Sequence, residues 1–361
     1  MNPSSLYIHI PFCSRKCLFC SFVIAVGQEH RREEYVKSLI NEMEKNEKKS
    51  LKTIYFGGGT PSMLDEKHLD VLMNAIKKKF SFENDIEITI EANPESINHA
   101  KAKFLKSLGF NRISLGVQTM DDRYLKFLGR GHDASMAQKA YGILREADFA
   151  NINLDLMYAF PGQTPEELET DVRAISLLDS EHLSLYTLTI EPNSRFYATQ
   201  MKLDDDEKLA RQYLLIARVL IEYGFKQYEV SNFSRPGFQS VHNTNYWLGN
   251  EYIGLGVGAH GFTGRRRYWN TSNLQDYIKR AGGGGQVIEG FEDLTDLQLI
   301  MEKVLFGLRM NAGISWDLIP SAKKDQIQEW IKDGFLLHEQ GNLKTTDRGR
   351  LVLDELSSRL I

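Results

Sequence analysis

The sequence has little cysteine, no long apolar run and no excess charge of one sign. Its three cysteines lie within eight residues, so they cannot form a disulfide framework. No apolar run is long enough for a membrane span, and no basic segment followed by an apolar one marks a signal peptide. A formal net charge of −4 provides no basic surface for nucleic acid. We expect a cytoplasmic protein with no nucleic-acid partner, and any membrane contact to be peripheral.

Apolar runs alternate with amphipathic stretches over residues 1–225. A chain of 361 residues, 42% of them apolar, suits one large barrel with a small appendage. Six strand–helix units imply a parallel sheet with right-handed crossovers, and both an incomplete barrel and an open doubly wound sheet fit this order. The predicted strands are 5–10, 53–56, 86–90, 112–117, 152–157 and 183–190, and the predicted helices are 32–45, 66–79, 99–108, 135–147, 165–178 and 206–223.

The pattern changes after residue 225. Residues 226–285 are predicted to extend the barrel through loops and short strands, with the glycine run 282–285 as a linker. Residues 286–361 follow a helix–helix–hairpin–helix order that resembles a winged helix. This segment has 9 basic and 13 acidic side chains, which favours a structural or docking role over DNA binding. The predicted division is therefore 1–225, 226–285 and 286–361.

The three cysteines follow the first predicted strand with the spacing Cys13-x-x-x-Cys17-x-x-Cys20. Thiolates at this spacing can bind three irons of a [4Fe–4S] cluster. Because there is no fourth cysteine, the fourth iron would keep a vacant position for a reacting ligand. A zinc site completed by His9 or His30, and three inert buried thiols, are the alternatives. The spacing favours the cluster.

Residues 7–20, YIHIPFCSRKCLFC, resemble the signature of radical S-adenosylmethionine (SAM) enzymes. They resemble more narrowly the oxygen-independent coproporphyrinogen oxidase family and its haem-chaperone branch, and the likeness covers essentially the whole chain. It implies an α/β fold, an incomplete parallel (β/α)6 barrel with a small winged-helix-like α+β domain at the C-terminus. It further implies that Cys13, Cys17 and Cys20 hold a [4Fe–4S] cluster. SAM would chelate the open iron and yield a 5′-deoxyadenosyl radical on reductive cleavage.

The resemblance also implies a set of SAM contacts. Glycines in the loop 57–62 let a backbone approach a ligand closely and offer N–H donors to a carboxylate. Glu91 matches a ligand of the SAM amine, Arg130 a partner of the SAM carboxylate, and Asp155 a contact to the ribose hydroxyls. The implied SAM-binding residues are Tyr7, Phe19, Gly58, Gly59, Thr60, Glu91, Gln118, Arg130, Asp155 and Thr189.

Three features favour the chaperone branch over the oxidase. Phe22 occupies the position of a further cysteine typical of the oxidase, and few residues precede Cys13 where the oxidase has a long segment. Residues 242–247, HNTNYW, match the HNxxYW motif of the chaperone branch. Neutral imidazole is a common axial ligand of haem iron, so His242 is the predicted ligand. His260 either faces the site or caps a glycine-rich turn, and the turn is favoured.

These observations predict a haem chaperone that binds haem and transfers it to acceptors such as respiratory cytochromes, supported by the cluster and SAM. Whether SAM is turned over, and hence whether the protein is an enzyme, stays open. The alternatives are an oxygen-independent coproporphyrinogen III oxidase and a haem-acting radical SAM methyltransferase. A zinc or electron-transfer module is disfavoured, because it does not explain the glycine-rich loop together with Glu91, Gln118 and Asp155.

Overall fold

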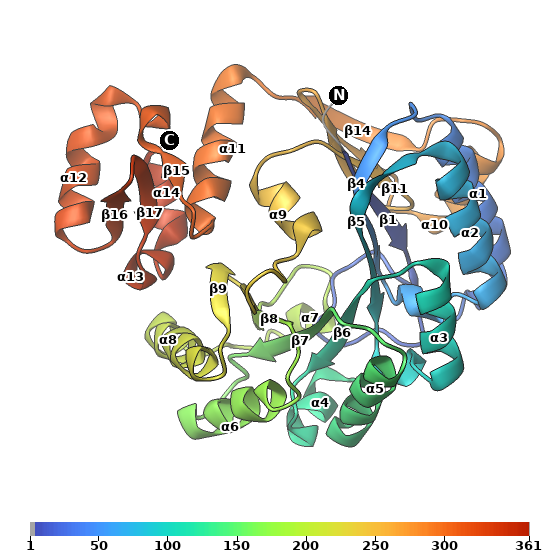
Figure 1. The fold of residues 1–361 in the computed structure, drawn as a ribbon, viewed down its shortest axis with the longest axis horizontal. Helices are drawn as coiled ribbons and strands as arrows, with labels where there is room; N and C mark the ends of the chain where they lie inside the picture. The colour runs from blue at the N-terminus through green and yellow to red at the C-terminus, as the bar shows by residue number, and fades with distance from the viewer. Residues whose placement is uncertain (1–3, 361) are drawn as a thin grey trace.

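A computed structural model describes residues 4–360 of the chain. Its centre is a run of six parallel strands that are neighbours in chain order within one twelve-stranded sheet (Figure 1). Most of their side chains are buried, as expected for a sheet covered on both sides, although the N-terminal part of β5 is exposed. The six strands are β1 (Ser4–Ile10), β4 (Ser50–Gly58), β5 (Ser81–Ala92), β6 (Arg112–Gln118), β7 (Ile152–Tyr158) and β8 (His182–Thr187).

Helices cover the outer side of this curved sheet (Figure 1). Side-chain caps begin several of them; Thr164, for example, forms a reciprocal capping box with Glu167 at the start of α6. The six predicted helices agree with the structure to within two residues, whereas α4 (Asp122–Leu128) and α7 (Arg195–Ala198) were not predicted. The predicted six are α1 (Arg32–Glu44), α2 (Glu66–Lys79), α3 (His99–Leu108), α5 (Ala134–Glu146), α6 (Pro165–Ser176) and α8 (Asp206–Glu222). Within residues 4–360, no helix is long and apolar enough to cross a bilayer.

The sheet continues on both sides of the parallel strands. Beyond β8 lie β10 (Asn232–Ser234) and β9 (Lys226–Glu229), both antiparallel to their neighbours. Beyond β1 lies a parallel strand, β11, and then an antiparallel extension. The strands on this side are β11 (Tyr252–Leu255), β12 (His260–Thr263), β13 (Arg266–Asn270) and β14 (Ile288–Asp293).

Strand β14 corrects the predicted domain boundary at residue 286. It pairs with β13, with Arg266 opposite Asp293, so residues up to 293 belong to the main sheet. The glycine run does not form the predicted linker. It ends α10 (Leu274–Gly282) in a turn whose Gly284 and Gly285 carbonyls accept hydrogen bonds from Lys45, which follows the last residue of α1. These contacts hold the turn against the barrel.

The HNxxYW segment is a helix, α9 (Val241–Trp247), and the prediction of a loop was wrong. The Ser240 side chain accepts a hydrogen bond from the Asn243 amide and so caps the helix. Figure 1 shows α9 on the inner side of the curved sheet, between β5 and α11. The motif therefore points into the molecule from a rigid element.

The last 65 described residues form a unit with its own apolar core, which includes Leu308, Ile327, Trp330 and Leu343. Its order of elements follows the predicted helix–helix–hairpin–helix pattern, with one short additional strand, β15, and with the final helix divided in two. An ion pair between Arg309 and the fully buried Glu229, at 2.5 Å, joins the unit to β9. The elements are α11 (Asp296–Arg309), β15 (Ile314–Ser315), α12 (Lys324–Lys332), β16 (Leu336–Glu339), β17 (Asn342–Thr345), α13 (Asp347–Arg350) and α14 (Leu353–Leu360).

Candidate cofactor site and adjoining cavity

The three cysteines lie in one lobe after β1. Cys13 ends β2 (Phe12–Cys13), which pairs with β3 (Ala25–Val26) and so closes the lobe at its base. The Cys20 amide donates to the Cys17 carbonyl at 3.3 Å, which forms a turn between these two residues. All three thiols are free and partly buried. The fold therefore keeps them unpaired and close to the C-terminal ends of the parallel strands.

The surroundings of these thiols fit a cluster. Burial raises the pKa of Cys13 to about 11 and also raises the pKa of Cys20, so metal binding must displace protons. The Arg130 guanidinium donates to the Cys17 sulfur at 3.6 Å and would balance thiolate charge. No three or more His, Cys, Asp or Glu side chains in residues 4–360 form a group placed to hold one metal ion. The thiolates of a cubane each bind a different iron, so they need not converge on one point.

The loop after β4 meets the end of β5 through Glu91. The Gly58 amide donates to one Glu91 carboxylate oxygen at 3.0 Å, and the Tyr55 hydroxyl donates to the other at 2.8 Å. Burial raises the pKa of Glu91 to about 7, and the nearby Asp155 adds to the rise. Glu91 can therefore take up a proton near neutral pH, and a cationic ligand would favour its charged form.

Two glycines in this loop are required by close contacts. Gly58 has a φ of +115°, and a Cβ there would lie 2.6 Å from the His9 ring. A Cβ on Gly59 would lie 2.7 Å from the Pro11 carbonyl oxygen. The next residue, Thr60, is buried and its hydroxyl lies 3.3 Å from the Cys13 sulfur. The glycine loop and the cysteine lobe are thus in direct contact.

Arg130 and Gln118 approach the same region from β6 and the loop after α4. Arg130 donates to the Asn93 side-chain oxygen and to the Gly116 carbonyl, both at 2.7 Å. Asn93 in turn donates to the Thr60 hydroxyl at 2.9 Å. Gln118 ends β6 with a φ of 73° and is half-buried. Arg130 is therefore held between the cysteine lobe and the strand ends.

Asp155 lies in the middle of β7 and faces the interior of the barrel. It accepts hydrogen bonds from Asn153 at 2.7 Å and from Ser114 at 3.3 Å. Burial raises the pKa of Asp155 to about 6. A carboxylate in this position can accept from ligand hydroxyl groups at neutral pH.

Thr189 and Phe19 make no hydrogen bond to the residues just described, among residues 4–360, and their predicted SAM contacts stay predictions. Thr189 is exposed beyond the end of β8, where its hydroxyl donates to Glu191 at 3.3 Å. Phe19 packs against a small apolar cluster that contains Leu128 and Phe160. Tyr7, by contrast, lies beside Gly58 and Glu91, and its hydroxyl is 3.0 Å from the His9 ring.

His242 is 1% exposed, and both of its ring nitrogens are already used. Nδ1 lies 2.7 Å from the Thr53 hydroxyl, and Nε2 lies 2.8 Å from the Tyr246 hydroxyl. Because Thr53 donates to Ser5, Nδ1–H of His242 donates to Thr53 and Nε2 accepts from Tyr246. Burial lowers the pKa of His242 to about 3, so the ring is neutral. In this arrangement no lone pair of His242 is free for a metal.

His242 instead supports Glu91 through Tyr55. The rings of His242 and Tyr55 are stacked with their centroids 4.9 Å apart, and the Tyr55 hydroxyl donates to Glu91. Sequence reasoning missed Tyr55 and Asn93. A signal was present for Tyr55, because it lies two residues before Gly57 on the same strand face.

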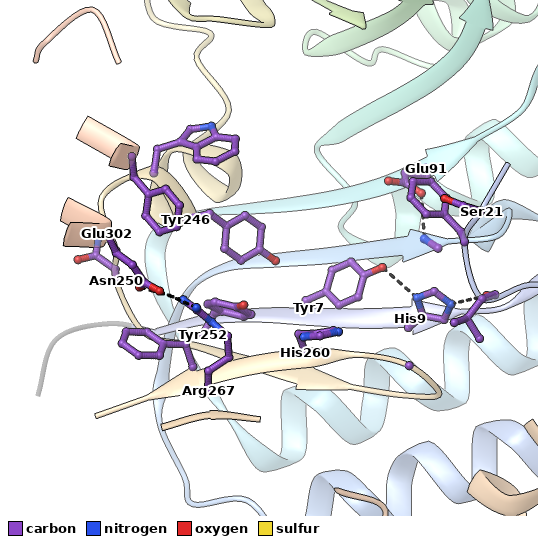
Figure 2. A pocket seen from close by; sticks show the side chains of 18 residues that line it. Tyr7, His9, Ser21, Glu91, Tyr246, Asn250, Tyr252, His260, Arg267 and Glu302 are labelled. Carbon is purple, nitrogen blue, oxygen red and sulfur yellow. Dashed lines mark hydrogen bonds and ion pairs between the residues drawn. The ribbon is translucent and has the colours of Figure 1, made fainter. Parts of the chain in front are cut away.

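A cavity of about 560 Å³ begins at Gly58 and Glu91 and extends to helix α11 of the C-terminal unit (Figure 2). Its volume is typical of small-molecule sites, which span roughly 300–1,000 Å³. Aromatic rings form much of its wall. The lining residues are Tyr7, His9, Ser21, Phe22, Val23, Gly58, Glu91, Tyr246, Trp247, Gly249, Asn250, Tyr252, Gly258, His260, Phe262, Arg267, Glu302 and Phe306.

Comparison with known proteins identifies the family. A family model described as the radical SAM superfamily matches residues 7–175. The chain is 37% identical over 360 residues to the haem chaperone HemW of Lactococcus lactis subsp. lactis (strain IL1403), covering 96% of this chain and 94% of that protein. It is 35% identical over 373 residues to the haem chaperone HemW of Bacillus subtilis (strain 168), covering 98% and 97%. The chain belongs to the HemW family of the radical SAM superfamily.

A solved structure shares the whole fold of this HemW-family chain. Coproporphyrinogen III oxidase (HemN) from Escherichia coli, a radical SAM enzyme, is similar with a TM-score of 0.86 and 25% identity, covering 99% of this chain and 90% of that chain. The predicted family and the predicted incomplete barrel are confirmed. Superfamily membership also confirms the predicted cofactors, a [4Fe–4S] cluster and SAM.

In this HemW-family chain, the structure also corrects the prediction that His260 caps a turn. His260 is the first residue of β12, and its side chain lines the cavity. In the view of Figure 2 its ring lies between the Arg267–Glu302 pair and His9. The three arginines at 265–267 are each ion-paired, with Asp296, Asp293 and Glu302 in that order.

Proposed function

We propose that this protein is a haem chaperone, which binds haem in the cavity and passes it to acceptor haemoproteins such as respiratory cytochromes. The observation that carries the proposal is the aromatic-walled cavity of about 560 Å³ beside the cofactor residues. Haem is a flat, largely apolar macrocycle, and aromatic side chains bury such a surface well. The relatives named haem chaperones match this chain over nearly their entire length, which supports the same role.

The residues around the strand ends would hold the two other cofactors. Cys13, Cys17 and Cys20 would bind three irons of the [4Fe–4S] cluster, with Arg130 balancing their charge. When bound, the cluster can supply the electron that cleaves SAM. The buried Glu91 carboxylate would accept from the SAM amine, and Asp155 from the ribose hydroxyls. Gly58, Gly59 and Thr60 would form the backbone wall of this site.

The cavity opens between the cysteine lobe and the C-terminal unit, which fits a cargo that must leave again. Phe22 from the lobe and Phe306 from α11 both line it. Phe22 is 67% exposed, so a bound macrocycle would cover an apolar ring that now faces solvent. Three free thiols fit a reducing compartment, the cytoplasm.

The second candidate is coproporphyrinogen III oxidase activity. The likeness to the Escherichia coli oxidase over the whole chain favours it. The cavity adjoins the SAM residues, so a substrate bound there would be close to a radical source. Phe22, in place of a further cysteine, favours the chaperone.

Anaerobic titration with haemin tests the proposal. We expect a Soret band that saturates near one haem per chain, and loss of that haem to an added haem-free cytochrome. We also expect coproporphyrinogen III, supplied with SAM and a reductant, to remain unconverted. Absence of a Soret band would refute the chaperone, and formation of protoporphyrinogen would establish the oxidase instead.

A further inference from the structure

Two histidines line the cavity, and they differ in what their ring nitrogens contact. His9 is 6% exposed, with Nδ1 3.0 Å from the Tyr7 hydroxyl and Nε2 2.7 Å from the Val23 carbonyl oxygen. His260 makes no hydrogen bond or ion pair through its side chain with any residue in the range 4–360, and its side chain is exposed toward the cavity. His242 does not line the cavity and has both nitrogens occupied.

The fold orients the His260 side chain toward the cavity. His260 and Phe262 are two residues apart on β12 and both line the cavity, as alternation along a strand requires. Between them, Gly261 faces the Tyr268 ring so closely that a Cβ there would lie 2.2 Å from it. The His260 ring also stacks on Trp269 of β13, with centroids 6.1 Å apart. A one-residue shift of β12 would therefore clash with Tyr268.

The electrostatics favour a neutral ring. Partial burial lowers the pKa of His260, and the positive charge of Arg267 lowers it further. A neutral imidazole keeps a lone pair, which is the form that binds iron. Arg267 is the one Arg or Lys among the residues that line the cavity. It pairs with Glu302, so a ligand carboxylate would bind it in exchange for Glu302.

We infer that His260 provides the axial ligand to haem iron in this cavity, and that His242 is a positioning residue. This inference rests on the proposed haem binding and names the group that coordinates the cargo. Coordination forms a bond from the free imidazole nitrogen to iron with no redox change. Tyr246 and Trp247 of the HNxxYW motif then line the cavity. His242 stacks on Tyr55, whose hydroxyl donates a hydrogen bond to Glu91.

The test compares haemin binding by the full chain and by three variants, followed by absorption and EPR spectra of the ferric complex. His260→Gly removes the proposed ligand and leaves a space for free imidazole. His242→Gln tests the motif histidine, and His30→Ala removes an exposed histidine outside the cavity as a control. We expect His260→Gly alone to lose the imidazole-ligated spectrum and to weaken haem binding by about tenfold or more. Added imidazole should restore the spectrum.

The outcomes separate this inference from the proposed function. No Soret band with the unaltered protein would refute haem binding itself. A band that His260→Gly leaves unchanged, or one that His242→Gln alone alters, would overturn the assignment of His260 while haem binding stands. Loss of the spectrum in His260→Gly without rescue by imidazole, in a variant whose circular dichroism matches the unaltered protein, would also overturn it.

Discussion

Arg267 on β13 meets Glu302 on α11 in a two-point ion pair, with N–O distances of 2.6 and 3.0 Å. Both residues line the cavity, so the pair joins the sheet extension to the C-terminal unit at the edge of the proposed haem site (Figure 2). Haem carries two propionates, which bind guanidinium groups in the same two-point manner. Glu302 therefore binds the Arg267 guanidinium that a haem propionate would otherwise bind.

Replacing Glu302 with Gln should strengthen haem binding. The change frees Arg267 for a propionate, so haem binding no longer has to break the ion pair. Because partly exposed ion pairs contribute about 0.5–1 kcal/mol, we expect a two- to fivefold lower Kd for haem. A haemin titration followed at the Soret band measures it. Glu289→Gln on the exposed strand β14 removes the same charge away from Arg267 and should leave the Kd unchanged. Weaker binding by Glu302→Gln would mean that the ion pair shapes the cavity.

Cys17→Ala should abolish the cluster. With one of three thiolates missing, one iron loses its protein ligand, and the charge-transfer absorption and EPR signal of a reduced [4Fe–4S] cluster should be absent after anaerobic reconstitution. Ser14→Ala alters an exposed side chain in the same lobe and serves as the control. Retention of bound iron and of the EPR signal by Cys17→Ala would contradict the assignment of the three cysteines.

Glu91→Gln should weaken SAM binding by about 10- to 100-fold. The change removes the negative charge of the carboxylate that accepts a hydrogen bond from the Gly58 amide and would accept one from the SAM amine. A hydrogen bond to a charged group contributes about 1.5–3 kcal/mol. Calorimetric titration of SAM into the reconstituted protein measures it. Glu83→Gln, in the exposed part of the same strand, is the matched control. Equal SAM affinity in both variants would place the amine elsewhere.

Glu42 should make the stability depend on pH. It accepts hydrogen bonds from Gly256, Asn270 and Tyr277, yet burial outweighs these bonds and raises the pKa of Glu42 from 4.5 to about 7. The folded chain thus binds this proton more tightly than the unfolded chain. Glu42 therefore stabilises the folded chain most below pH 4.5. This stabilisation falls by about 3 kcal/mol as the pH rises from 4.5 to 7, and it does not change further above pH 7.

Glu42→Gln isolates this effect. Urea unfolding at pH 5 and pH 8 should show that the unaltered protein loses about 2–3 kcal/mol more than the variant over this interval. Glu44→Gln, on the exposed side of the same helix, controls for the loss of one carboxylate. Parallel pH curves for the unaltered protein and Glu42→Gln would show that Glu42 is charged in the folded state throughout.

The grouping of the candidate cofactor residues was largely predictable from sequence because they lie in single loops or at strand ends. The cysteines lie in a single loop, and Gly58 and Glu91 lie at the ends of successive parallel strands, whose C-terminal ends must meet at one edge. Asn93 was not predictable, because its role depends on Thr60 and Arg130, which approach from two other elements. The SAM contact predicted for Thr189 stays a prediction, and this residue lies two positions beyond the end of β8.

The sequence by itself determined the order of strands and helices and the chemistry of the cysteine lobe, because periodicity and spacing act over a few residues. Only the tertiary structure decided which histidine faces the cavity. His242 lies in the more conspicuous motif, but Thr53 and Tyr246 occupy its nitrogens. His260 lies on a hairpin strand and faces a cavity whose other lining residues come from β1, α9 and α11. Contacts between segments this far apart in the chain leave no pattern in the local sequence.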